Sequence, residues 1–199
     1  WFGGMKKHLA WVNTTRVYGS AINASELSRA EMEARRDAHS IVKFYKDELP
    51  GFENAHIVQT SPTIGIRETR RLIGEVTLTG DDIRAQAEYK DAIALGAWPI
   101  DVHPSQGQSG VHAMYVPLPY QIPYRALLPQ IIGGLIVGGR SISLDREALG
   151  SARVGATCGA TGHAAGVAAA LASKNQISVR QVGYPELREE LTHQSAILE

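Results

Sequence analysis

The chain has 199 residues, of which 44% are hydrophobic and 20% charged, as expected for one globular domain or two small ones. Its 20 basic and 20 acidic residues balance, which argues against a nucleic-acid partner and against a polybasic membrane patch. No apolar run reaches the ~18–20 residues that span a bilayer, and we expect no signal peptide. The single cysteine excludes an internal disulfide or a cysteine-ligated iron–sulfur cluster within this chain and favours a reducing, cytoplasmic location.

The first long periodic segment, residues 25–49, predicts a helix. Ser28 and Glu31 have the spacing of a capping box at its start. Pro50 and Gly51 directly after the segment would stop it.

The next segments predict a mixture of extended and helical structure. Residues 55–60 predict a short strand, and residues 64–79 predict extended structure with a bend. Thr79 and Asp82 are suited to cap a second helix, which we expect to run to Leu95.

The second half begins with extended segments separated by loops. Residues 98–103 predict a strand and residues 103–110 a loop, while the four prolines of residues 115–129 indicate an edge strand or an extended wall. The apolar run at 135–139 predicts a strand buried on both faces. Residues 185–194 predict a final helix with proline at its start. The fold class is therefore α+β / α/β.

A glycine-rich stretch, residues 155–172, carries glycines at 155, 159, 162 and 166 among small residues. We expect Gly159 and Gly162 in the first turn of a helix, where unpaired N–H groups suit a phosphate, a carboxylate or the pyrimidine edge of a flavin. Gly166 and the neighbouring alanines would let the helix pack closely on a sheet. Close packing without any ligand is the alternative. Because no G-x-G triplet occurs, the stretch is not a usual dinucleotide pyrophosphate loop.

Residues 135–172, "LIVGGRSISLDREALGSARVGATCGATGHAAGVAAALA", resemble the C-terminal signature of the FAD-dependent oxidoreductases. Upstream blocks are similar to that family in the same order: "RVYG", "LSRAEMEARRDAHSIVKFYKDELPGFENAHIV", "SPTIGIRETRRLIGEVTLTGDDI", "KDAIALGAWPIDVH" and "YQIPYRALLP". The resemblance extends from about residue 11 to about residue 195.

This resemblance implies a two-domain flavoprotein, with a mostly antiparallel substrate domain inserted into a doubly wound FAD-binding domain. Residues 1–130 would be the substrate-domain portion and residues 131–199 the C-terminal strand and helix of the FAD-binding domain. The family's N-terminal ADP-binding glycines have no counterpart here. We therefore expect this chain to be the C-terminal portion of a longer flavoprotein, with the ADP-binding segment as its missing partner. We expect this portion to be inactive alone.

The resemblance also implies two groups of cofactor-binding residues. The first group lies where the last strand meets FAD and adds backbone and hydroxyl contacts: Gly138, Gly139, Arg140, Ser141 and Ser143. The second would present N–H groups to the N1–C2=O edge of the isoalloxazine: Thr157, Cys158, Gly159 and Gly162. Reduced flavin carries negative charge at that edge, so a helix N-terminus would raise its reduction potential.

Cys158 has two interpretations at this position. A helix N-terminus could lower its pKa and make it reactive. The preferred alternative is a small buried residue without chemistry.

Arginine, histidine and tyrosine residues are the candidates for substrate chemistry. Arg67 and Arg70 could clamp a carboxylate, or could form a structural network with Glu68. Asp101 and His103 lie two residues apart on one strand face, where His103 could exchange a proton beside a flavin or form only a surface hydrogen bond.

The segment around Tyr124 and Arg125 is stiffened by prolines, which suits a substrate wall or a protected sheet edge equally. The histidines show no tight metal-ligand spacing, so we expect no metal site.

The function expected from the whole sequence is FAD-dependent oxidoreduction, with hydride transfer between a small organic substrate and flavin N5, in a protein that could be an oligomer. A non-catalytic binding or structural module that kept the fold without the cofactor is the first alternative. A lyase or hydrolase with His103 and Tyr124 as acid and base is the second.

Overall fold

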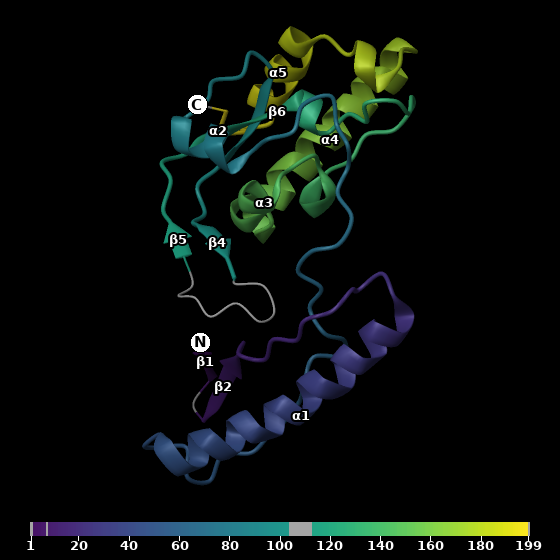
Figure 1. Ribbon diagram of the computed structural model, residues 1–199. Helices are drawn as coiled ribbons and strands as arrows, with labels where there is room; N and C mark the ends of the chain where they lie inside the picture. The colour runs from purple at the N-terminus through teal and green to yellow at the C-terminus, as the bar shows by residue number, and fades with distance from the viewer. Residues whose placement is uncertain (1, 7, 104–112, 199) are drawn as a thin grey trace. The chain divides into compact units, whose positions relative to one another are not determined.

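The computed structural model describes residues 2–6, 8–103 and 113–198 (Figure 1). The chain divides into two compact units, residues 1–69 and residues 70–199. The boundary predicted near residue 130 separates a substrate-domain portion from an FAD-binding portion. The division into compact units does not test it, so it stays a prediction. Apart from His103, the loop expected at 103–110 lies outside the described residues.

The N-terminal unit contains a hairpin and one long helix. Strands β1 (Phe2–Lys6) and β2 (Leu9–Val12) pair antiparallel, with a register irregularity between Gly4 and Lys6. Helix α1 spans Ala24–Glu48, which confirms the helix predicted at 25–49. Tyr45 is buried on α1, and its ring meets that of Phe52 edge-on at 5.6 Å, which fixes the chain beyond the helix.

The predicted capping box of α1 is wrong, because the helix begins earlier in the sequence. Asn23 is the cap, and its side-chain oxygen accepts from the backbone N–H groups of Ser25 (3.0 Å) and Glu26 (3.1 Å). Ser28 lies inside the helix, where its hydroxyl donates to the Ala24 carbonyl. Asparagine is at least as good a cap as serine, so the helix gains a further turn.

The strand predicted at residues 55–60 is also absent. The chain just after it is held by α1 side chains instead of by a neighbouring strand. Arg35 donates to the carbonyls of Ser61 and Pro62, and Glu31 accepts from Ile64 N at 2.8 Å. With its backbone groups used by helix side chains, this segment follows the helix as an irregular strap.

The C-terminal unit begins with a short helix where a longer one was expected. Helix α2 (Gly80–Ala85) has the predicted capping box of Thr79 and Asp82, but it ends at Gln86 in the left-handed conformation. The remaining residues to Leu95 are not helical. Strand β3 (Ala92–Gly96) takes their place because its continuous apolar run is buried in a sheet with β6 (Tyr120–Pro123).

A second antiparallel pair joins β4 (Ile100–Val102) to β5 (Ala113–Tyr115). Strand β4 confirms the strand predicted at 98–103. Among the described residues β3 is the only ladder partner of β6, which fits the edge position expected from the prolines.

The buried strand predicted at 135–139 is not formed. Residues 135–138 belong to no helix or strand, although Val137 N donates to Leu127 O at 2.9 Å, and Leu135 is 42% exposed. The strand pairs of the described residues are antiparallel, and the one parallel contact is an isolated bridge between Leu78 and Leu144. The architecture is thus a mixture of helices and small sheets, compatible with α+β.

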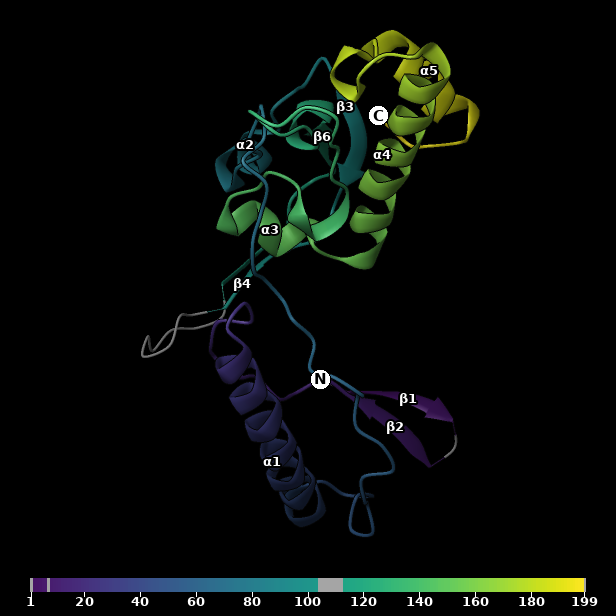
Figure 2. The same cartoon turned by 90° about the vertical axis from the view of Figure 1, so that its right-hand side faces the viewer.

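Three helices complete this unit: α3 (Arg146–Ala152), α4 (Gly155–Asn175) and α5 (Tyr184–His193). Helix α5 confirms the predicted final helix with proline in its first turn. Figure 2 shows α4 beside β3, with α5 at its C-terminal half. The core lies between α4 and the β3–β6 sheet, and its fully buried side chains include Ile93, Ile122, Leu127, Ile142, Leu149, Leu187 and Leu191.

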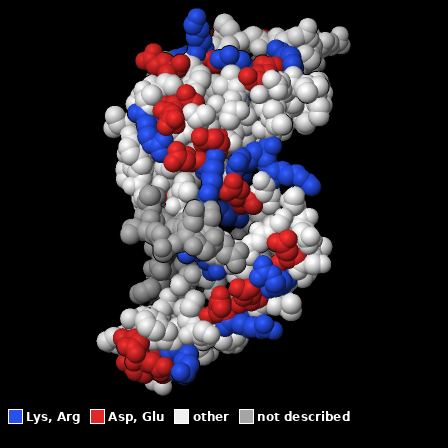
Figure 3. Space-filling view, in the orientation of Figure 1, with Lys and Arg blue, Asp and Glu red and all other residues white. Residues whose placement is uncertain are grey.

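The surface carries both signs of charge. Acidic and basic side chains are interspersed over the face seen in Figure 3. Within the described ranges, no helix has the length and apolarity needed to cross a bilayer.

Candidate functional site

The N-terminus of α4 lies where the sequence predicted a ligand-facing helix start. Val154 precedes the helix in an extended conformation, and no side chain caps it. Cys158 N already bonds to Val154 O at 2.9 Å. The amides at the uncapped end are therefore those of Gly155, Ala156 and Thr157, whereas Gly159 and Gly162, expected in the first turn, lie farther along the helix.

The glycines of α4 form an exposed stripe. A Cβ added at Gly155, Gly159 or Gly166 would meet nothing within 4 Å. The opposite face is buried through alanines, as predicted for Ala164, Ala165 and Ala168, whereas Ala169, predicted to pack with them, is exposed. The packing role expected for Gly166 is wrong, because helical spacing places it with the exposed glycines and not with the alanines.

A second segment crosses α4 at close range. A Cβ on Gly138 would lie 2.9 Å from the Cα of Gly162, so the two backbones touch at this point. Next to it, Gly139 N donates to the Thr161 hydroxyl at 3.0 Å, and Gly139 has φ +79, which favours glycine. The short 3-10 helix η2 (Gly139–Ser141) is thereby fixed beside the first turns of α4.

Cys158 is half-buried beside η2. Its thiol donates to the carbonyl of Arg153 at 3.3 Å. Burial raises the pKa of the Cys158 thiol, and the nearby charge of Arg140 lowers it by less. These contacts favour the interpretation of Cys158 as a small structural residue over that of a reactive thiolate.

Asp101 and His103 form the pair that their spacing predicted. His103 Nε2 lies 3.2 Å from Asp101 Oδ1, and both side chains are mostly buried. The other carboxylate oxygen, Oδ2, accepts from Arg153 Nη2 at 2.8 Å. Asp101 thus links an imidazole to a guanidinium at the end of β4.

Sequence reasoning missed the residues of α3 and its C-cap, Arg153, that contact this pair. Arg146 Nη2 donates to the His103 carbonyl, and Arg153 Nη2 donates to the Asp101 carbonyl, each at 3.0 Å. Gly150 lies between them, and a Cβ there would be 3.1 Å from the Asp101 carbonyl oxygen. The signal in the sequence was the helical spacing of residues 146, 150 and 153, which places them on one face.

Arg153 brings the two predicted parts of the site together. Its carbonyl accepts from Cys158 on α4, while its guanidinium donates to Asp101 on β4. We call the set formed by Asp101, His103, Arg153 and the α4 start at residues 155–159 the α3–α4 corner. It combines the His103 imidazole with an uncapped helix N-terminus.

A comparison with protein-family models matches residues 3–191 to the family described as FAD dependent oxidoreductase. The chain belongs to the FAD-dependent oxidoreductases. Comparisons with curated proteins and with solved structures gave no match. Family membership identifies a flavoprotein family with redox function and agrees with the resemblance recognised in the sequence.

The α3–α4 corner of this FAD-dependent oxidoreductase has features that suit the ring end of a flavin. The first-turn amides of α4 have no capping side chain, and the bare surface at Gly155 and Gly159 leaves room for a flat ligand. Arg140 adds positive charge near Cys158. A helix N-terminus and a cation suit the negative pyrimidine edge of reduced flavin.

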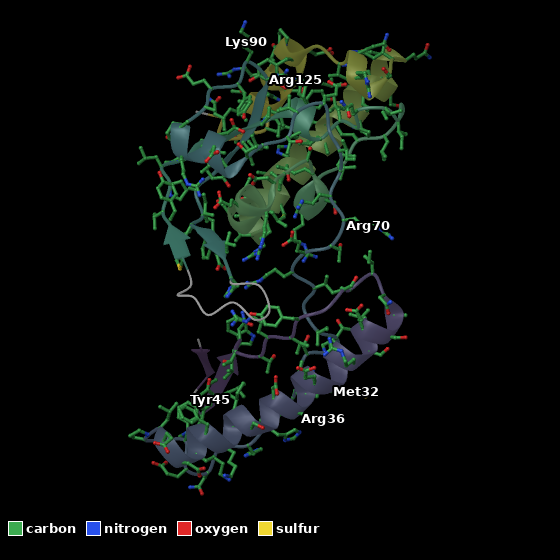
Figure 4. All side chains as sticks on the ribbon, in the orientation of Figure 1. Met32, Arg36, Tyr45, Arg70, Lys90 and Arg125 are labelled. Carbon is green, nitrogen blue, oxygen red and sulfur yellow. The ribbon has the colours of Figure 1, made fainter. Side chains whose placement is uncertain are left out.

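Tyr124 and Arg125, predicted as a substrate wall, have structural partners elsewhere in the oxidoreductase. The Tyr124 hydroxyl donates to Val179 O at 2.7 Å, and burial, with the Glu75 charge, raises the pKa of Tyr124 to about 12. Arg125 contacts both oxygens of Asp91, at 2.9 and 3.0 Å (its position is marked in Figure 4). The part of these residues in substrate binding stays a prediction.

The pairing with Arg125 changes the pKa of Asp91. Burial raises the pKa of the Asp91 carboxyl, but the hydrogen bonds and the positive charge of Arg125, with a backbone hydrogen bond of Asp91 itself, together lower the pKa below its usual range. The backbone N–H of Arg125 also donates to Asp91, at 3.0 Å. This geometry anchors the short helix η1 (Tyr124–Ala126) to the start of β3.

The remaining predicted cofactor and substrate residues are Ser141, Ser143, Arg67 and Arg70. Ser143 is fully buried, and its hydroxyl accepts from Gly74 N and bonds to Thr77, while Ser141 is exposed on η2. Arg67 belongs to the N-terminal unit, and the exposed Arg70 begins the C-terminal one (Figure 4). Their assignments stay predictions, although the Ser143 hydroxyl is already used by partners within the chain.

No group of three or more histidine, cysteine, aspartate or glutamate side chains that could hold a metal ion occurs in the described part of the chain.

Proposed function

We propose that this chain supplies the flavin-ring end of an FAD site and transfers hydride between a small organic substrate and flavin N5. The observation that carries the proposal is the double contact of Arg153, which joins the α4 start to the Asp101–His103 pair. Family membership supports the cofactor, and the α3–α4 corner supports its place.

The α4 start has an electrostatic role in this proposal. The amides of Gly155, Ala156 and Thr157 would face the pyrimidine edge, and Arg140 would add a positive charge nearby. Both favour negative charge at that edge over a neutral ring. These residues would therefore raise the reduction potential and favour hydride acceptance by the cofactor.

His103 has the proton-transfer role. Oxidation of a small organic substrate by hydride transfer releases a hydride and a proton, and a bound flavin would supply the hydride acceptor, N5. The His103 imidazole would take the proton, and in the reverse direction it would return it. Asp101, 3.2 Å away, stabilises the imidazolium formed in that step.

Titration of the chain with FAD tests the proposal. We expect the visible flavin band to shift and FAD fluorescence to change saturably, with dithionite reduction bleaching the bound band. Because the ADP-binding glycines have no counterpart in this chain, the same titration is run with riboflavin, which carries the flavin ring without the ADP half. Protein that leaves both flavin spectra unchanged would refute the proposal and favour the non-catalytic module. Turnover without flavin would favour the lyase or hydrolase.

A further inference from the structure

The strongest unassigned feature is the face of α3 that meets the end of β4. We propose that Arg146, Gly150 and Arg153 are positioning residues that hold the Asp101 carboxylate against the His103 imidazole and so set the proton affinity of His103. The use of the His103 proton in hydride transfer rests on the proposed function. The effect of these side chains on the proton affinity of His103 does not.

Gly150 allows the contact. A Cβ at this position would lie 3.1 Å from the Asp101 carbonyl oxygen and 3.2 Å from a Val102 methyl group. Since one neighbour is backbone, it cannot rotate away as a flexible side chain would. The bare glycine lets the α3 backbone approach β4 directly.

The two arginines fix β4 on either side of this contact. Arg146 donates to the His103 carbonyl, and Arg153 donates to both the carbonyl and the carboxylate of Asp101. They lie four residues before and three residues after Gly150, so all three share one helix face. Backbone and side chain of the Asp101–His103 segment are therefore set by one element.

The charges of this arrangement act on His103 in opposite directions. The Asp101 carboxylate favours the imidazolium. Arg153, only 13% exposed at its side chain, neutralises part of that carboxylate, and Arg146 adds a second positive charge near His103. Removal of the anion and removal of the cation must therefore change the proton affinity of His103 with opposite signs.

NMR titration of the histidine ring resonances in the full chain measures this coupling without any flavin. In Asp101→Asn we expect the midpoint of the His103 titration to fall by about one pH unit. In Arg153→Gln we expect it to rise, by a smaller amount because Arg153 reaches His103 through Asp101. The matched control is Asp81→Asn, since the Asp81 side chain is 94% exposed and pairs with Arg84 on α2, and it should leave the midpoint unchanged.

A purely structural clamp gives a different result, because loosening it by either substitution would shift the midpoint in the same direction. Shifts of the His103 midpoint in the same direction in the two variants, or an unchanged midpoint in Asp101→Asn, would overturn the proposal. If Asp101→Asn does not fold, Arg153→Gln decides alone: a rise supports the coupling, and an unchanged or lowered midpoint contradicts it. Loss of FAD binding with this coupling intact would count only against the proposed function.

Discussion

Gly138 packs directly on the backbone of Gly162, and the two glycines are not equivalent. A Cβ on Gly138 would come within 2.9 Å of the Gly162 Cα, whereas a Cβ on Gly162 would meet nothing within 4 Å. The small residue is required on the crossing segment and not on the helix. Part of the glycine pattern therefore serves contact within the chain, and the rest leaves a bare surface.

The first prediction rests on this asymmetry. We expect Gly138→Ala to lower the free energy of unfolding by about 1–3 kcal/mol, because its methyl group overlaps helix backbone. Gly162→Ala should be neutral or stabilising by up to about 1 kcal/mol, since alanine favours the helix. Urea unfolding followed by circular dichroism measures both. Equal effects of the two substitutions would contradict the observed packing.

The second prediction concerns alkaline pH and Tyr124, whose folded pKa is about 12. An unfolded tyrosine ionises near pH 10, so the stability that the neutral hydroxyl contributes is present below about pH 10 and is lost as the pH rises toward 12. Tyr124→Phe should cost about 1 kcal/mol at neutral pH by leaving Val179 O without this donor. It should also weaken the alkaline loss of stability.

Urea unfolding at pH 7 and pH 11 tests this prediction. Tyr115→Phe is the matched control, because the Tyr115 side chain is 43% exposed on β5. A larger loss of stability at neutral pH in the control than in Tyr124→Phe would contradict a structural role for the Tyr124 hydroxyl.

The third prediction concerns Cys158, whose pKa is raised by burial. Because thiolate is the reactive form, alkylation by iodoacetamide at pH 8 should be slower in the native chain than in the urea-unfolded chain. The neutral thiol contributes stability below its unfolded pKa, and this contribution is lost as the pH rises through the folded value. Mass spectrometry of timed samples gives the rates. Faster alkylation of the native chain would restore the reactive-thiol interpretation.

Local sequence signals predicted several elements well. The Thr79–Asp82 capping box, the short extended segment that contains β4 and the proline in the first turn of α5 each act within a few residues, so their pattern is sufficient. The Ser28–Glu31 box failed because Asn23, a competing cap, lies one turn earlier. Short-range patterns do not show which of two good capping residues starts a helix when both lie close together in the sequence.

Long-range pairing was harder to predict. The run at 135–139 has the composition of a central strand, but a strand forms only where a neighbouring strand satisfies its backbone groups along its length. Here the bond from Val137 N to Leu127 O is not continued into a strand pair. Likewise, Asp101 and His103 were paired from their spacing, whereas Arg153 was missed because its contact joins residues 52 apart. The sequence thus identified the chemical groups of the site better than the supports that hold them.

The central claim is that the bare start of α4 receives the flavin ring, and paired substitutions on one helix test it most directly. A Cβ at Gly159 or at Gly166 would meet nothing within 4 Å, and leucine favours a helix over glycine, so both Gly159→Leu and Gly166→Leu should keep or slightly raise stability. Unlike Gly159, Gly166 lines a groove between α4 and α5, together with Lys174 and Glu190. In an FAD titration followed by flavin fluorescence, we expect Gly159→Leu to weaken binding at least about tenfold, as expected for a loss of about 1.4 kcal/mol, while Gly166→Leu binds as the parent chain does. Equal FAD affinity of the two folded variants would contradict the account.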